Sequence, residues 1–108
     1  MKVENIKNFK NGWIAGNFEP ALINTKDFEI AVHHHEKGFI PEPHYQKTAT
    51  EYNIIVSGNI MVNGKELKDG DIFIYAPYEV CDVEFLDDSI IVCFKVPSVG
   101  PEDKVVVE

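Results

Sequence analysis

The chain is divided into many short apolar stretches by turn signals, and this division constrains the fold more than any other feature. Short strands are predicted at residues 28–32, 52–56, 60–62, 72–75, 81–86 and 89–96. Asn63-Gly64 and Asp69-Gly70 predict tight hairpin turns, because these residues tolerate a positive φ. No stretch keeps a helical period, and many short strands at regular spacing favour an all-β sandwich or barrel.

Length and charge set the broad class. The 108 residues fit one domain, 1–108, with a core at about 28–96 and terminal segments that pack on the barrel or on a partner subunit. The net charge of −8 argues against nucleic acid and against an anionic membrane. No apolar run approaches the ~20 residues of a membrane span. Residues 1–10 lack the apolar centre of a signal peptide, and two cysteines are too few for a disulfide scaffold, so we expect a cytoplasmic protein.

Polar groups gather in one short part of the sequence. His44 and Gln46 are two residues apart, so on a strand they point to the same face. Glu51 follows after a short turn and opens an otherwise apolar strand, on the same parity as Asn53 and Ile55. A carboxylate that faces inward must be paired, hydrogen-bonded or bound to a metal ion. The pattern predicts half of a metal site or the floor of a polar pocket.

The two cysteines are expected to be buried for different reasons. Cys81, Val83 and Phe85 share one face of their strand, and Asp82 and Glu84 lie on the other. The thiol of Cys81 is therefore predicted to be on the apolar, inward face. It is either a fourth member of the polar group or a small buried hydrophobe, the commoner fate of a free cysteine. Cys93 alternates with apolar residues, and we assign it to the core.

Three consecutive histidines end the strand that begins at residue 28. Parity puts His34 on the face of Ile30 and Val32, and places His33 and His35 on the opposite face. Histidines two apart could hold a metal ion, but we favour a polar strand end that faces water or a subunit. Trp13 is expected to anchor packing or a dimer contact.

The spacing of these residues resembles the first motif of the cupin superfamily, small β-barrels of the double-stranded β-helix type. That motif runs glycine, five residues, histidine, one residue, histidine, three or four residues, glutamate, six residues, glycine. The matching positions here are Gly38, His44, Gln46, Glu51 and Gly58, with glutamine in place of the second histidine.

The second cupin motif is matched less closely. It runs glycine, five residues, proline, one residue, glycine, two residues, histidine, three residues, asparagine. Gly70 and the following Asp71 fit, and the later positions fall on Ala76, Tyr78, Cys81 and Phe85. If Pro77 is taken as the motif proline, Asp82 falls on the histidine position, but strand parity favours Cys81.

The resemblance covers about residues 28–96 and implies a cupin-type, jelly-roll-like barrel whose mouth holds the ligand, in a homodimer. It also implies a metal set of His44, Gln46, Glu51 and Cys81, and a thiolate, imidazole and carboxylate suit zinc better than iron or nickel. The outer face at Tyr52, Ile54 and Val56 is apolar and suits a partner sheet or subunit.

Three functions follow from this pattern. The first is a module that binds a small polar molecule, such as a sugar or an organic acid, with at most a weakly bound divalent metal. Walls would come from Phe73, Tyr75, Val83 and Phe85, and hydrogen bonds from His44, Gln46, Glu51 and Asn53. The second is a metal-dependent dioxygenase or isomerase, or an isomerase that uses His44 as a general base without metal. The third is a structural or regulatory homodimer.

Overall fold

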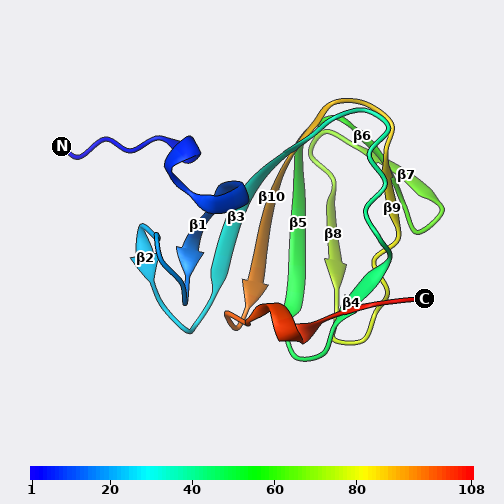
Figure 1. Cartoon of the computed structure of the whole chain (residues 1–108). Coiled ribbons are helices and arrows are strands. Elements are labelled where there is room, and N and C mark those ends of the chain that lie inside the picture. The colour runs from blue at the N-terminus through cyan, green and yellow to red at the C-terminus, as the bar shows by residue number, and fades with distance from the viewer.

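The computed structural model describes all 108 residues, and strands provide most of its regular structure. One sheet has six strands in the order β2-β1-β3-β10-β5-β8 (Figure 1). In chain order these are β1 (Trp13–Gly16), β2 (Ile23–Asn24), β3 (Glu29–His35), β5 (Thr50–Ser57), β8 (Ile72–Tyr75) and β10 (Ser89–Val96). All neighbours in this sheet are antiparallel except β1 and β2, which are parallel. The predicted all-β fold class is confirmed.

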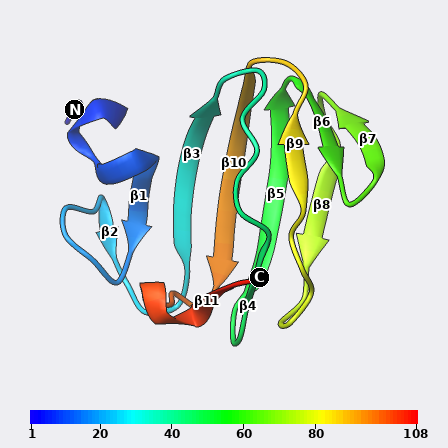
Figure 2. The same ribbon diagram turned by 45° about the vertical axis from the view of Figure 1, so that its right-hand side comes forward.

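Two smaller sheets complete the molecule. The order β7-β6-β9 joins β6 (Asn59–Val62), β7 (Lys65–Lys68) and β9 (Val83–Phe85), and β4 (His44–Gln46) pairs with β11 (Lys104–Val106). Figure 2 shows β4 and β9 in front of the six-stranded sheet, so they form a second layer. The remaining helical turns are η1 (Ile6–Asn8), η2 (Lys10–Gly12) and η3 (Pro101–Asp103). None of these turns has the length or the apolar composition needed to cross a bilayer.

Backbone hydrogen bonds between distant segments hold the front of the barrel together. The N–H of Gly38 donates to the carbonyl of Phe85 at 2.7 Å, and the N–H of Phe85 donates to Phe39 at 3.0 Å. His44 and Cys81 exchange two further bonds, of 2.6 and 3.2 Å. The segment before β4 therefore lies beside β9, which brings the two sequence motifs together.

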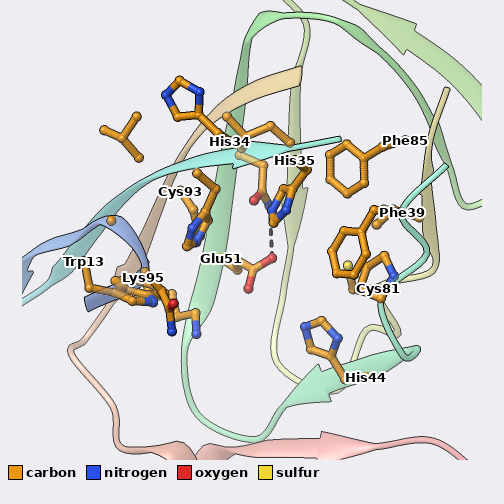
Figure 3. Close-up of a pocket in the computed structure, with 18 of the residues that line it drawn as sticks. Trp13, His34, His35, Phe39, His44, Glu51, Cys81, Phe85, Cys93 and Lys95 are labelled. Carbon is orange, nitrogen blue, oxygen red and sulfur yellow. Dashed lines mark hydrogen bonds between the residues drawn. The ribbon is translucent and has the colours of Figure 1, made fainter. Parts of the chain in front are cut away.

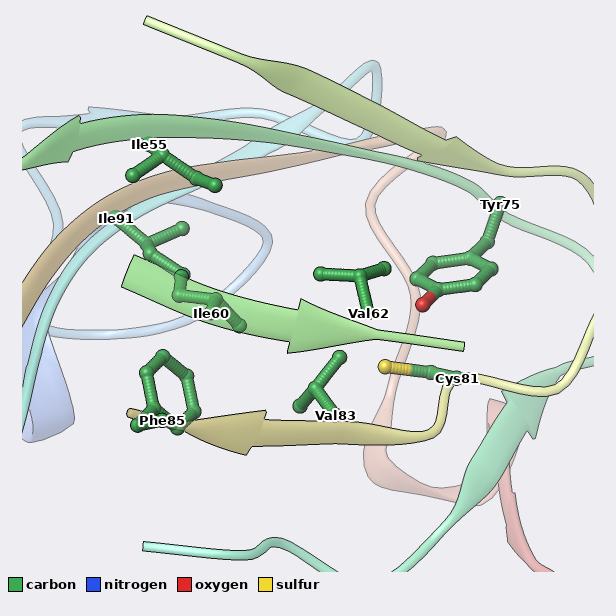
Figure 4. Packing of buried hydrophobic residues seen from close by; sticks show 8 residues of the cluster. All are labelled: Ile55, Ile60, Val62, Tyr75, Cys81, Val83, Phe85 and Ile91. Carbon is green, nitrogen blue, oxygen red and sulfur yellow. The ribbon is translucent and has the colours of Figure 1, made fainter. Parts of the chain in front are cut away.

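The hydrophobic cluster sits between β5 and β10 of the large sheet and the strands β6 and β9 (Figure 4). Ile55 and Ile60 are completely buried at its centre. The other members are Val62, Tyr75, Cys81, Val83, Phe85 and Ile91. Burial of apolar surface stabilises a fold by about 25 cal/mol per Å², so this cluster is what holds the two sheets face to face.

Most predicted strands are present, and β10 has the predicted bounds, 89–96. The Asn63-Gly64 turn joins β6 to β7, with φ of 46° and 82°. The predicted strand 81–86 is shorter than expected, because Cys81 forms only an isolated bridge to His44 before β9 begins. The sequence analysis missed β1, β2, β7 and β11, which are two to four residues long and too short to show a period.

Alternation along the central strands agrees with the predicted parity. Glu51, Asn53 and Ile55 of β5 are buried, while Tyr52 and Ile54 lie on the other, partly exposed face. In β3, His34 is exposed, and His33 and His35 are half-buried on the inner face. Both strands therefore present one face to the interior of the barrel and one to the outside.

Candidate functional site

A cavity of about 740 Å³ opens at the polar end of the barrel interior (Figure 3). It is bordered by eight of the residues predicted from the sequence: His44, Gln46, Glu51, Asn53, Phe73, Cys81, Val83 and Phe85. Tyr75 was predicted as a wall residue and is the exception, because its ring packs in the hydrophobic cluster. Its hydroxyl donates to Asn63 Oδ1 at 2.7 Å, which fixes the ring away from the cavity.

Glu51 lies in the middle of the cavity in the view of Figure 3. Only 7% of this residue is exposed. Its Oε2 accepts a hydrogen bond of 3.0 Å from Asn53 Nδ2, which comes from the same face of β5. No protein group donates to Oε1. One carboxylate oxygen is thus satisfied by the protein, and the other is available to a molecule in the cavity.

Gln46 is the second incompletely satisfied group. It is 5% exposed, and its Nε2 is buried without a hydrogen-bond partner. An unpaired buried amide donor costs roughly 1–3 kcal/mol, so native proteins seldom keep one unless it has a role. The amide borders the same cavity as Glu51. The cavity therefore contains an unused donor as well as an unused acceptor.

The inner residues of the second motif do not provide a charged ligand. Cys81 is buried and faces inward, whereas Asp82 is exposed, as the strand parity predicts. Burial raises the pKa of the Cys81 thiol to about 12, with a further contribution from the charge of Glu51. Tyr78, at the position of the motif's second glycine, has a φ of 70°, the left-handed conformation that favours glycine.

The four predicted metal ligands surround one cavity but do not form a metal-binding cluster. No group of three His, Cys, Asp or Glu side chains is arranged to hold a metal ion. The donor set points the same way, because Gln46 stands in place of the motif's second histidine and its neutral amide is a weak ligand. These residues fit a metal-free polar cavity better than a metal centre.

His33 and His35 also border the cavity, although neither was predicted to line it. The expectation that they face water or a subunit is wrong, because alternation along β3 turns them inward on the side of Glu29 and Ala31. Burial lowers the pKa of His33 to about 4, helped by the neighbouring His35. Burial, with His34 second, also lowers the pKa of His35. Both imidazoles are therefore uncharged near neutral pH.

Aromatic rings line both sides of the cavity. His35 stacks on Phe39 at 5.0 Å between ring centroids and lies 4.5 Å from Phe85. On the other side, Trp13 meets His33 edge to face at 5.4 Å, and Lys95 Nζ lies 5.0 Å from the indole centroid. Trp13, predicted as a packing or dimer anchor, packs edge to face on both Phe18 and His33 and also borders the cavity.

Two further residues that border the cavity are Trp13 and Cys93. The preceding Gly12 has a φ of 79°, and a Cβ there would lie 1.9 Å from the carbonyl oxygen of Val32, so only glycine allows this approach. Cys93 is buried, as predicted, but it borders the cavity and lies outside the hydrophobic cluster. Burial raises the pKa of its thiol far above the usual range, so it contributes no charge.

Comparison with known proteins identifies the architecture. No protein-family model matches the sequence, and no curated protein matches it. Among solved structures, a conserved Klebsiella pneumoniae protein with a double-stranded β-helix domain is 21% identical, with a TM-score of 0.72 over 99% of this chain and 92% of that one. A cupin from Bacteroides fragilis is 23% identical, with a TM-score of 0.58 over 78% of this chain and 80% of that one. The chain has the cupin fold.

A third neighbour is an enzyme with the same fold. Pac13, a nucleoside dehydratase, is 12% identical, with a TM-score of 0.71 over 100% of this chain and 92% of its own. A variant of the Streptomyces protein has been solved with uridine. Identities at this level establish the shared fold alone, so the function of this cupin-fold chain has to be argued from its own residues.

The buried imidazole of His33 should make stability depend on pH. Its folded pKa, about 4, is below the ordinary value of 6.5, so the unfolded chain binds the proton more readily. The free energy of unfolding should therefore decrease by on the order of 2 kcal/mol as the pH falls from 6.5 toward 4. The free energy of unfolding, measured by urea denaturation between pH 7 and 4.5, should depend less steeply on pH in His33→Asn.

The matched control is His34→Asn, because this exposed neighbour lies on the other face of the same strand. Its pH dependence should follow that of the wild type. An unchanged slope in His33→Asn would contradict the assignment of the proton-linked loss to His33.

Proposed function

We propose that the barrel binds a small polyhydroxylated molecule of the sugar class in the cavity around Glu51. The observation that carries the proposal is the buried carboxylate, which has one protein hydrogen bond and one free oxygen. A partly satisfied buried carboxylate is costly unless a ligand supplies the missing donor. Ligand hydroxyl groups can do so without bringing a second negative charge beside Glu51.

The other groups that border the cavity suit the same class of ligand. The uncharged imidazoles of His33 and His35 each have one donor nitrogen and one acceptor nitrogen. Ligand hydroxyl groups can also both donate and accept hydrogen bonds, so they match such imidazoles. Trp13 and Phe39 provide apolar surfaces on opposite sides, in keeping with sites that combine apolar walls and a few polar groups. The similarity to Pac13, solved with uridine, supports a ligand that contains a sugar.

A simple organic acid fits this part of the cavity less well. Its carboxylate would lie close to that of Glu51, and two like charges in a poorly solvated site repel each other. Of the two predicted ligand classes, sugars and organic acids, the groups around Glu51 therefore favour sugars.

Thermal denaturation with a panel of neutral pentoses, hexoses and nucleosides tests the proposal. A ligand at 100 times its Kd stabilises the native state by about 2.7 kcal/mol, which raises the midpoint by several degrees. Glu51→Gln removes a charged acceptor worth about 1.5–3 kcal/mol, so binding should weaken by roughly 10–100-fold. The control Glu66→Gln, on exposed β7, should bind normally. If no member of the panel raises the midpoint, the proposal fails.

The metal-dependent enzyme is the alternative, and elemental analysis separates it from the binding module. We expect much less than one equivalent of zinc, iron or nickel in the purified protein, because no three His, Cys, Asp or Glu side chains are arranged to hold a metal ion and the Gln46 amide is a weak ligand. Near-stoichiometric metal that disappears in both Glu51→Ala and Cys81→Ser would overturn the metal-free proposal. It would favour an enzyme built on His44, Glu51 and Cys81.

A further inference from the structure

A second, smaller cavity of about 370 Å³ adjoins the first. The two cavities share four lining residues, Trp13, Gln46, Lys95 and Lys104. Lys104 is the register partner of Gln46 between β11 and β4, so their side chains stand on the same face. The shared wall therefore brings two ammonium groups to the border of the site in which the Gln46 amide lacks an acceptor.

Neither ammonium group at this junction takes part in an ion pair. Lys95 stands between Glu29 and Glu51 in the register of β3, β10 and β5, yet the only ion pair in the structure joins Lys2 and Glu4. Lys95 instead lies over the Trp13 ring. Lys104 is exposed and likewise unpaired.

The carboxylates near the junction already have donors of their own. Glu29 Oε1 accepts from the N–H of Val99 at 2.9 Å, and burial raises the pKa of Glu29. Glu19 also lines the second cavity, and its Oε1 accepts from Asn24 Nδ2 at 2.7 Å. Glu29 and Glu19 thus each have a protein donor and Glu51 keeps its free Oε1, while the lysines and the Gln46 amide have no acceptor in the protein.

We propose that Gln46, Lys95 and Lys104 bind an anionic group of the ligand, a carboxylate or a phosphate, at the junction of the two cavities. The inference rests on the proposed function, because it makes the ligand an acidic or phosphorylated sugar whose hydroxyl groups meet Glu51. Unpaired ammonium groups and an amide N–H are donors that match such an anion. Binding at this site weakens with salt, since the lysines are partly exposed.

Small anions test the junction directly. In ¹⁵N-labelled protein, the side-chain amide signal of Gln46, assigned with Gln46→Met, is followed during titration with sodium acetate or inorganic phosphate at constant ionic strength. We expect a saturable shift, with affinity at least about tenfold weaker in Lys95→Gln and in Lys104→Gln. Lys65→Gln, on exposed β7, is the control and should behave like the wild type. The tighter of the two anions distinguishes a carboxylate from a phosphate.

The outcomes separate this inference from the proposed function. A Gln46 signal that does not saturate with either anion, or that saturates equally in the lysine variants, overturns the anion site. Neutral sugars that still bind in a Glu51-dependent way would then leave the proposed function standing. If anions bind in a lysine-dependent way but no sugar raises the thermal midpoint, the anion site stands and the proposed sugar site fails. With both sites intact, glucuronate or glucose 6-phosphate should bind more tightly than glucose.

Discussion

The pairing of β10 with its two neighbours determines where every group in the cavity lies. Seven residue pairs align β10 with β3 and seven align it with β5. The register brings Glu29, Lys95 and Glu51 abreast in one row and Ala31, Cys93 and Asn53 in the next. Further along, Ile91 and Ile55 enter the hydrophobic cluster. On β5 and β10 the interior therefore changes from charged at Glu51 and Lys95 to apolar at Ile55 and Ile91. The inner face of β3 stays polar, because His33 and His35, which border the cavity, follow Glu29 and Ala31.

The buried polar groups of the chain divide into two kinds. Asp103 accepts bonds of 2.9 to 3.2 Å from the N–H groups of Thr48 and Ala49, and although burial raises its pKa, these bonds lower it overall. This residue ties the C-terminal segment to the β4–β5 turn, and its hydrogen-bonding capacity is used. Glu51 and Gln46, equally buried, keep an oxygen and an amide nitrogen without partners. The contrast separates a structural group from groups that a ligand would complete.

The sequence predicted the barrel and the centre of its cavity because those features rest on alternation and turn chemistry. Glu51 and Asn53 could be placed inward since every second residue of 52–56 is apolar on the other side. The parity of His33 and His35 was also correct, but histidine is common on both faces of strands, so parity alone did not reveal a cavity wall. Trp13 and Lys104 belong to strands of three or four residues whose position depends on distant partners. Tyr75 has the inward parity, and its hydroxyl bond to Asn63 could not be foreseen.

Alternation also keeps two surfaces of the same strands chemically independent. In β3, β5, β8 and β10 the side chains at odd positions point into the barrel, and those at even positions form the outer face. A substitution at position 33, 53 or 93 can remodel what the cavity accepts without changing the outer face, and a substitution at 54 or 92 can change the outer face without changing the cavity. Such a fold can change its ligand and its outer surface independently, because the two depend on alternate residues of the same four strands.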